Sequence, residues 1–220
     1  MKKEIILTKD GSTSIFLPEL NETYHSKFGA IQEAKHVFIK NGLSLFNNES
    51  VSVLEIGFGT GLNAFITFLE ANKINQNINY VGIEAYPVEL EIINKLNYVS
   101  ELEAAVHEAV FKKIHQSNWE IENQISATFK LTKRNQKFQD ISDKNQYNLI
   151  YFDAFGFDVQ PELWNEEIFL KMYESLLPKG ILVTYACRTS IKKAMLKAGF
   201  RVEKLPGAPG KREMLRAFKE

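Results

Sequence analysis

The sequence has a single cysteine, Cys187, among its 220 residues, so it can form no disulfide within the chain and offers no multi-cysteine metal site. Its four histidines do not have the spacing of zinc ligands, and we expect no metal. No apolar run reaches the roughly 18 residues that span a bilayer. Charged residues also interrupt the N-terminal segment before a signal-like apolar core can form. We therefore expect a soluble cytoplasmic protein without a membrane partner.

The chain has no excess of positive or negative charge, since its net charge is zero. Its basic and acidic residues are nevertheless unevenly distributed along the sequence. Residues 188–220 contain ten Lys or Arg and three Asp or Glu, a net charge of +7, so the rest of the chain carries −7. This asymmetry predicts a basic face that could bind a polyanion. The alternative is an ordinary solvated helix surface.

The length and the hydrophobic share of 45% suit one domain with an ordinary core. Strand-like and helix-like segments alternate from residue 51 onward, which predicts a Rossmann-like α/β fold with helices on both faces of the sheet. We expect a seven-stranded, mostly parallel sheet whose last strand is antiparallel, with the final two strands paired at the sheet edge. The expected strands are 51–56, 79–83, 127–132, 147–152, 181–186, 200–205 and 213–218, and the expected helices 62–71, 88–96, 101–116, 162–177 and 189–198. Residues 117–146 are polar and give no clear assignment.

The first 45 residues are predicted to precede the main fold. Residues 4–8 and 13–17 are β-prone, and the Asp10-Gly11 pair between them favours a tight hairpin turn. A helical pattern then runs over 30–41 and stops at Gly42. We therefore divide the chain into a hairpin and helix over 1–45 and a main domain over 46–220.

The clearest motif joins the first strand of the main domain to a helix through three alternate glycines, Gly57, Gly59 and Gly61. Glycine permits the tight turn and lets a ligand lie against bare backbone, and the helix start offers free N–H groups. Glu84 follows the next strand, about twenty residues on, where a carboxylate can accept both ribose hydroxyl hydrogens. The pattern predicts a nucleoside-containing cofactor.

Two cofactor classes compete for this loop. The dinucleotide pattern places a glycine at its sixth position, where this chain has Leu62, and Glu55 would repel a pyrophosphate. S-adenosylmethionine has no phosphate, and Glu55 could hold its amino group directly or through water. The motif Glu-x-Gly-x-Gly-x-Gly therefore resembles the first motif of class I methyltransferases. A nicotinamide or flavin enzyme and a packing loop without ligand remain as alternatives.

The fourth strand of the main domain ends in Asp153, which places a carboxylate at the ligand edge of the sheet. Phe155 follows, and an aromatic ring there could stack on a base. The alternative for Asp153 is a turn cap. Downstream, Pro161 suits a first helical turn, and Trp164 is interpreted as a core residue rather than a ligand platform.

Several segments in order make the chain similar to one known family, the methyltransferase domain of the MnmC tRNA-modifying enzymes. These segments are Tyr24-His25-Ser26, Gly29-Ala30, Glu33, His36-Val37-Phe38, Leu54–Asn63, Phe152-Asp153-Ala154-Phe155, Pro161-Glu162-Leu163-Trp164 and Lys211-Arg212-Glu213-Met214. The resemblance implies a class I methyltransferase fold and N-methylation of 5-aminomethyl(-2-thio)uridine at the tRNA wobble position, giving 5-methylaminomethyl(-2-thio)uridine. It also implies a stand-alone form without the FAD-dependent oxidase half. Either another protein then supplies the amine, or the precursor arrives as the aminomethyl form.

Site residues are expected as follows. Asp153 and Phe155 are the catalytic candidates, with Asp153 orienting the amine first and accepting a proton second. The candidates for substrate binding are Lys211 and Arg212, which would contact tRNA phosphates. The cofactor candidates are Glu55, Gly57, Gly59, Gly61, Asn63, Glu84, Tyr24 and His25, the last two on the resemblance alone.

One departure from many class I enzymes concerns adenine. They place an acid after the third strand, where this chain has Lys133-Arg134-Asn135, so Asp140 is only a distant candidate for the adenine contact.

Three other functions stay open at this point. The first is methylation of a small-molecule or protein amine, and the second is a non-catalytic nucleotide-binding scaffold. The third is carbon methylation through Cys187, for which the sequence shows no activating partner. The oligomeric state is not predicted.

Overall fold

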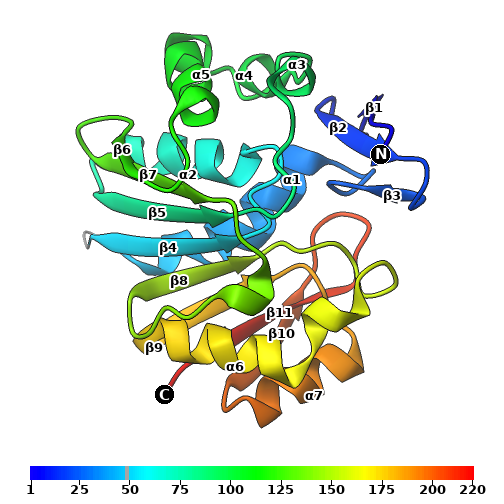
Figure 1. Ribbon diagram of the computed structural model, residues 1–220, viewed down its shortest axis with the longest axis vertical. Helices are drawn as coiled ribbons and strands as arrows, with labels where there is room; N and C mark the ends of the chain where they lie inside the picture. The colour runs from blue at the N-terminus through cyan, green and yellow to red at the C-terminus, as the bar shows by residue number, and fades with distance from the viewer. Residues whose placement is uncertain (48–49) are drawn as a thin grey trace.

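The computed structural model describes residues 1–47 and 50–220 and contains one large and one small β-sheet (Figure 1). The large sheet has eight strands in the order β10-β11-β9-β8-β4-β5-β7-β6. In that order their bounds are Arg201–Pro206, Glu213–Phe218, Leu176–Thr184, Tyr147–Phe152, Val51–Ile56, Ile78–Ile83, Phe129–Arg134 and Glu122–Gln124. Strands β9, β8, β4, β5 and β7 pair in parallel, whereas β11 is antiparallel to both neighbours and β6 is antiparallel to β7.

The predicted Rossmann-like α/β class is confirmed, with one difference in detail. The sheet has eight strands rather than seven, because β6 adds a short edge strand from the polar stretch 117–146. Its sequence Glu-Asn-Gln has no apolar alternation, so periodicity could not reveal it. The expected antiparallel pair at the sheet edge is confirmed: β10 is the outer strand, and β11 lies between β9 and β10, which agrees with its buried Met214, Leu215 and Ala217.

The predicted helices are present, and several differ in length or division. The helical segments are α1 (Ala30–Ala34) with a π-helical continuation (Lys35–Lys40), α2 (Leu62–Lys73), α3 (Leu90–Ile93), α4 (Tyr98–Glu101), α5 (Glu108–Gln116), α6 (Glu166–Ser175) and α7 (Thr189–Lys197). The helix predicted from Glu162 divides in two, because the Asn165 side chain caps α6 by accepting the Ile168 N–H at 3.0 Å. A 3-10 turn, Pro161–Trp164, precedes that cap.

The central strands of the large sheet are buried on both faces, as parallel strands covered by helices require. In β8, for example, Leu149 and Tyr151 pack with α1, α2 and α5, whereas Ile150 and Phe152 pack with α6 and α7. Figure 1 shows α6 and α7 on one side and α2 and α5 on the other.

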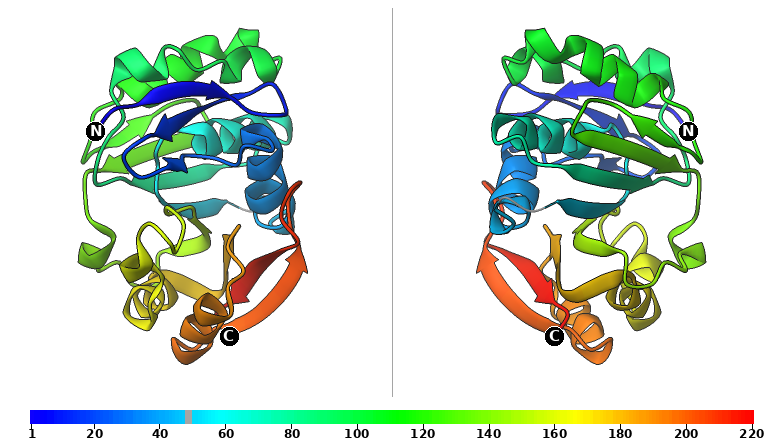
Figure 2. Two further views of the ribbon diagram at one scale, coloured as in Figure 1. Left: turned by 90° about the vertical axis from the view of Figure 1, so that its right-hand side faces the viewer. Right: turned by 90° about the vertical axis from the view of Figure 1, so that its left-hand side faces the viewer.

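The N-terminal segment forms the small sheet of β1 (Glu4–Leu7), β2 (Thr13–Leu17) and β3 (Glu22–Thr23). The predicted hairpin is confirmed, with Leu7 opposite Thr13. Figure 2 shows these strands, in blue, far from the red and orange C-terminal strands. Helix α1 contributes to the same buried cluster as β4 and α2, and the division at residue 45 stays a prediction. No helix in the described ranges has the length and apolar character of a membrane span.

Chain order places a switch point between β4 and β8. From β4 the chain builds β5 and β7 on one side, and it then builds β8 and β9 on the other. In open α/β sheets, ligands bind outside the carboxyl ends of the strands at such a point.

Candidate active site

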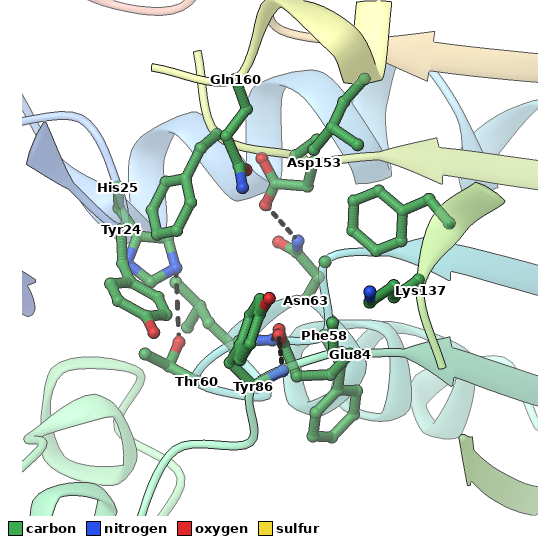
Figure 3. A pocket seen from close by; sticks show the side chains of 18 of the residues that line it. Tyr24, His25, Phe58, Thr60, Asn63, Glu84, Tyr86, Lys137, Asp153 and Gln160 are labelled. Atoms are coloured by element: carbon green, nitrogen blue, oxygen red, sulfur yellow. Dashed lines mark hydrogen bonds between the residues drawn. The ribbon is translucent and has the colours of Figure 1, made fainter. Parts of the chain in front are cut away.

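A cavity of about 300 Å³ lies at the carboxyl ends of β4, β5, β7 and β8 (Figure 3). Its wall combines the glycine loop after β4 with Glu84 after β5 and Asp153 after β8, and the N-terminal Tyr24 and His25 close one side. Of the predicted site residues, the structure brings eight to this cavity: Tyr24, His25, Gly57, Gly59, Asn63, Glu84, Asp153 and Phe155.

The glycine loop is held in place by the strands beside it. Gly57 has φ +90°, and a Cβ built there would lie 2.6 Å from the Asp153 carbonyl oxygen, so only glycine fits. The Glu84 carboxylate accepts the Gly59 N–H at 3.0 Å and the Tyr86 N–H at 2.9 Å. Gly61 does not line the cavity: it caps α2 with φ +69°, and a Cβ there would meet the His115 ring at 2.6 Å. Its role is therefore in packing rather than in direct cofactor contact.

Two carboxylates share one amide beneath the cavity. The Asn63 Nδ2 group donates to Glu55 Oε1 and to Asp153 Oδ2, both at 2.8 Å. Burial raises the pKa of Glu55 well above its usual value, and the nearby Asp153 raises it further. Burial, with Glu33 adding to it, raises the pKa of Asp153 to about 7. Asp153 is thus poised between its charged and neutral forms near neutral pH.

Glu55 itself does not reach the cavity wall. Its residue is 0% exposed, and it acts on the site through Asn63. Strand β4 turns this side chain toward the face covered by α2. The expected hold on a cofactor amino group, directly or through water, stays a prediction.

Tyr24 and His25 lie over the glycine loop. A Cβ built on Gly59 would come within 3.2 Å of the Tyr24 ring, and the Tyr24 and Phe155 rings meet edge-on at 5.1 Å. The His25 Nε2 lies 3.3 Å from Thr60 Oγ1, and Nδ1 lies 3.1 Å from Ser14 Oγ. Burial lowers the pKa of His25 to about 4, so the ring is neutral and links β2 to the loop.

Two cavity segments were not identified from the sequence. Lys137, Phe138 and Gln139 follow β7, and Gln160, Glu162 and Leu163 precede α6. The predicted alternative, Asp140, is exposed and off the cavity wall. Gln139 lines the cavity after β7 in place of an acid, and its amide can both donate to and accept from an adenine edge. Trp164 is 1% exposed and donates to the Phe155 carbonyl at 2.8 Å, which confirms it as a core residue.

The two predicted phosphate contacts, Lys211 and Arg212, both line an outer hollow, but only Lys211 also lines a second cavity. Lys211 faces a second cavity of about 160 Å³ that Asp153 also lines, and its Nζ is 2.5 Å from Glu33 Oε1. Arg212 is exposed and lines a neighbouring hollow with Arg188.

Most of the basic C-terminal segment is neutralised by acids. Six of its ten Lys and Arg side chains form ion pairs, namely Arg188, Lys197, Arg201, Lys204, Lys211 and Arg216. The net charge of that segment therefore overstates the basic face, because its partners include acids elsewhere in the chain such as Asp158 and Glu166.

Cys187 shows no sign of nucleophilic activation. Burial and a hydrogen bond to Glu213 raise the pKa of its thiol, which disfavours the thiolate.

The residues at the first cavity fit a cationic cofactor. The wall carries the acidic side chains Glu84, Asp153 and Glu162, and Lys137 is its one Lys or Arg within the described ranges. A sulfonium and an amino group suit this wall, whereas a pyrophosphate would be repelled by it.

Known proteins with similar sequences and structures point the same way. A family model described as S-adenosyl-L-methionine-dependent methyltransferase matches residues 97–220. A crystal structure of MNMC2 from Aquifex aeolicus superposes with a TM-score of 0.76 at 21% identity, over 98% of this chain and 70% of that one. Spermidine synthase from Thermotoga maritima gives a TM-score of 0.57 at 14% identity, over 95% of this chain and 69% of that one. These likenesses show the fold.

Similar curated proteins are longer than this chain. The "tRNA 5-methylaminomethyl-2-thiouridine biosynthesis bifunctional protein MnmC" of Leptospira interrogans is 29% identical over 219 residues, which are 90% of this chain and 32% of that protein. The protein of the same name from Polaromonas naphthalenivorans is 25% identical over 239 residues, covering 98% and 36%. The chain thus spans about a third of the length of these relatives. With the family model covering more than half of its residues, the chain belongs to the S-adenosyl-L-methionine-dependent methyltransferase family.

Proposed function

We propose that this methyltransferase N-methylates 5-aminomethyl(-2-thio)uridine at the wobble position of tRNA, giving the 5-methylaminomethyl product. The carrying observation is the position of Asp153, which lines the cofactor cavity and also the adjoining second cavity. An acceptor nitrogen in the second cavity would meet the methyl group beside this carboxylate. The tRNA substrate is supported by the relatives named for this modification, which align with 90% or more of the chain.

The cofactor supplies an electrophilic methyl group on a sulfonium sulfur. The Glu84 carboxylate lines the cavity and would accept from the ribose hydroxyls, and the backbone of Gly57 and Gly59 would allow close approach. The side chains most suited to the adenine are those of Phe138 and Gln139, after β7. These groups position the cofactor, and positioning provides most of the rate when the nucleophile needs no covalent activation.

Asp153 can both orient the amine and take its proton. Transfer of a methyl group to the neutral amine forms a C–N bond, breaks the S–C bond and leaves a proton on the product nitrogen. An ordinary aspartate, with a pKa near 4, lies about 6 units below an alkylammonium. A pKa of about 7 for Asp153 reduces that gap to about 3 units, or from about 8 to about 4 kcal/mol. Burial therefore lessens the tendency of the carboxylate to hold the acceptor as an inert ammonium ion.

The test uses tRNA from a strain that lacks this gene. The purified protein and S-adenosylmethionine are added, and nucleosides from digested tRNA are analysed by mass. We expect the aminomethyl nucleoside to gain one methyl group, and Asp153→Asn to lower the single-turnover rate. Transfer to small-molecule or protein amines, with tRNA unchanged, would refute the tRNA assignment.

A further inference from the structure

The second cavity adjoins the cofactor cavity through Asp153 and the edge-on rings of Tyr24 and Phe155. On the side away from the cofactor it is walled by Glu33 and Lys211. At about 160 Å³ it is smaller than a whole ligand site, which typically exceeds about 300 Å³. It therefore suits one ring of a larger molecule.

The Lys211 ammonium group is held in place in this cavity by an ion pair and an aromatic ring. Its Nζ lies 2.5 Å from Glu33 Oε1 and 3.7 Å from the centre of the Tyr185 ring. Each partner is itself held: Glu33 Oε2 accepts the Ser26 N–H at 3.1 Å, and the Tyr185 hydroxyl donates to the Ala154 carbonyl at 2.8 Å. An ammonium has three donors, so one ion pair and one ring face leave it able to donate to a ligand.

We propose that the second cavity holds the pyrimidine ring of the acceptor, with Lys211 donating to a ring carbonyl and Glu33 acting as the positioning residue for Lys211. This inference rests on the proposed function. A uracil ring presents carbonyl acceptors but no negative charge, so one ammonium group that is already neutralised by Glu33 suits it as a hydrogen-bond donor. The exocyclic amine then lies at the junction of the two cavities, beside Asp153.

The neighbouring Arg212 is the matched control. It is exposed and shares the outer hollow with Lys211, but it does not line the second cavity, and it forms no ion pair with any residue that the structure describes. A phosphate contact is expected from such a side chain, because it is free to reach a polyanion. Lys211 and Arg212 are adjacent in sequence and equal in charge, so any difference between them reports their position.

The experiment measures kcat/KM for tRNA over a range of salt concentrations. We expect Lys211→Met to lower kcat/KM about 10- to 100-fold, the loss of one charged hydrogen bond, with an unchanged salt slope. Arg212→Met should instead reduce the slope of log kcat/KM against log salt by about one. Affinity for S-adenosylmethionine, measured by calorimetry, should equal the wild-type value in both and so confirm folding.

Two further variants sharpen the test. Lys211→Arg should lose activity as well, since a planar guanidinium does not fit between Glu33 and Tyr185; a phosphate contact would tolerate it. Glu33→Gln should lower kcat/KM alone, and its effect should be smaller when it is combined with Lys211→Met, because a positioning residue acts largely through its partner. Glu33 also raises the pKa of Asp153, so the variants are compared on full pH–rate profiles, in which a shift of the profile reports Asp153 and a lower plateau reports the loss of Lys211 positioning.

The outcomes separate the two proposals. Absence of tRNA methylation by the wild-type protein would refute the proposed function and this inference together. If the wild-type protein is active, three results would overturn this inference alone. They are an unchanged kcat/KM for Lys211→Met, a reduced salt slope for that variant, and full activity of Lys211→Arg.

Discussion

The raised pKa of Asp153 makes the stability of the protein depend on pH in a way that Asp153→Asn should remove. In the folded state this pKa is about 7, against an ordinary value of 3.8. Between those values the folded protein keeps a proton that the unfolded chain has released. The free energy of unfolding therefore falls as pH rises through the interval. At about 1.4 kcal/mol per pKa unit, the interval from 3.8 to about 7 is worth up to about 4 kcal/mol.

Asparagine does not titrate and can still accept from Asn63, so the variant should lack this loss. We expect Asp153→Asn to match the wild type below the interval and to be more stable above it by up to about 4 kcal/mol. Urea unfolding at pH values below, within and above the interval measures the difference. Glu55 contributes to both proteins, since burial is the largest cause of its own raised pKa. Parallel pH profiles for the two proteins would refute the reasoning.

Three further outcomes follow from single contacts. Gly57→Ala should destabilise the fold by about 1–3 kcal/mol and weaken cofactor binding, because φ is +90° and the new Cβ meets Asp153 at 2.6 Å; Gly156→Ala, with its nearest atom at 3.6 Å, is the control in thermal unfolding. Glu84→Gln should weaken S-adenosylmethionine binding in calorimetry about 10- to 100-fold, since an amide can accept through only one of its two groups; equal affinity would contradict the ribose assignment. Burial lowers the pKa of Lys133 to about 8, so between about 8 and 10.5 the folded protein has lost a proton that the unfolded chain still holds, and the free energy of unfolding rises with pH. Lys133→Met should abolish this rise. A rise that persists in denaturant titrations of the variant would contradict the assignment.

The sheet could be predicted from the sequence wherever burial on both faces imposes a pattern. Strand β8, nearly continuous in apolar residues, was placed at its true bounds, and so was β4. The polar β6 was missed, because three paired residues at an edge need only backbone hydrogen bonds. The antiparallel pair of β10 and β11 at the sheet edge was predicted, because two short β-prone segments joined by a Gly/Pro loop favour a hairpin.

The site could be predicted where chain direction alone decides it. The carboxyl ends of parallel strands meet at one edge, so the glycine loop, Glu84 and Asp153 had to converge there. The orientation of individual side chains did not follow. Glu55 precedes the loop by two residues and faces α2 instead, and Lys211 turns inward while Arg212 turns out. Each of these depends on the strand register and on partners distant in sequence, such as Glu33.

The hydrogen bonds of Asn63 explain how the fold accommodates the buried carboxyl group of Asp153, whose ionisation is costly. One amide group bridges Glu55 and Asp153, and two carboxylates this close disfavour ionisation of both. Burial raises the pKa of Glu55 well above its usual value, and it raises the pKa of Asp153 to about 7. An exposed aspartate would stabilise the fold better but would hold the acceptor amine as an ammonium ion. The stability lost by burying Asp153 is therefore the same free energy that brings its pKa closer to that of the amine.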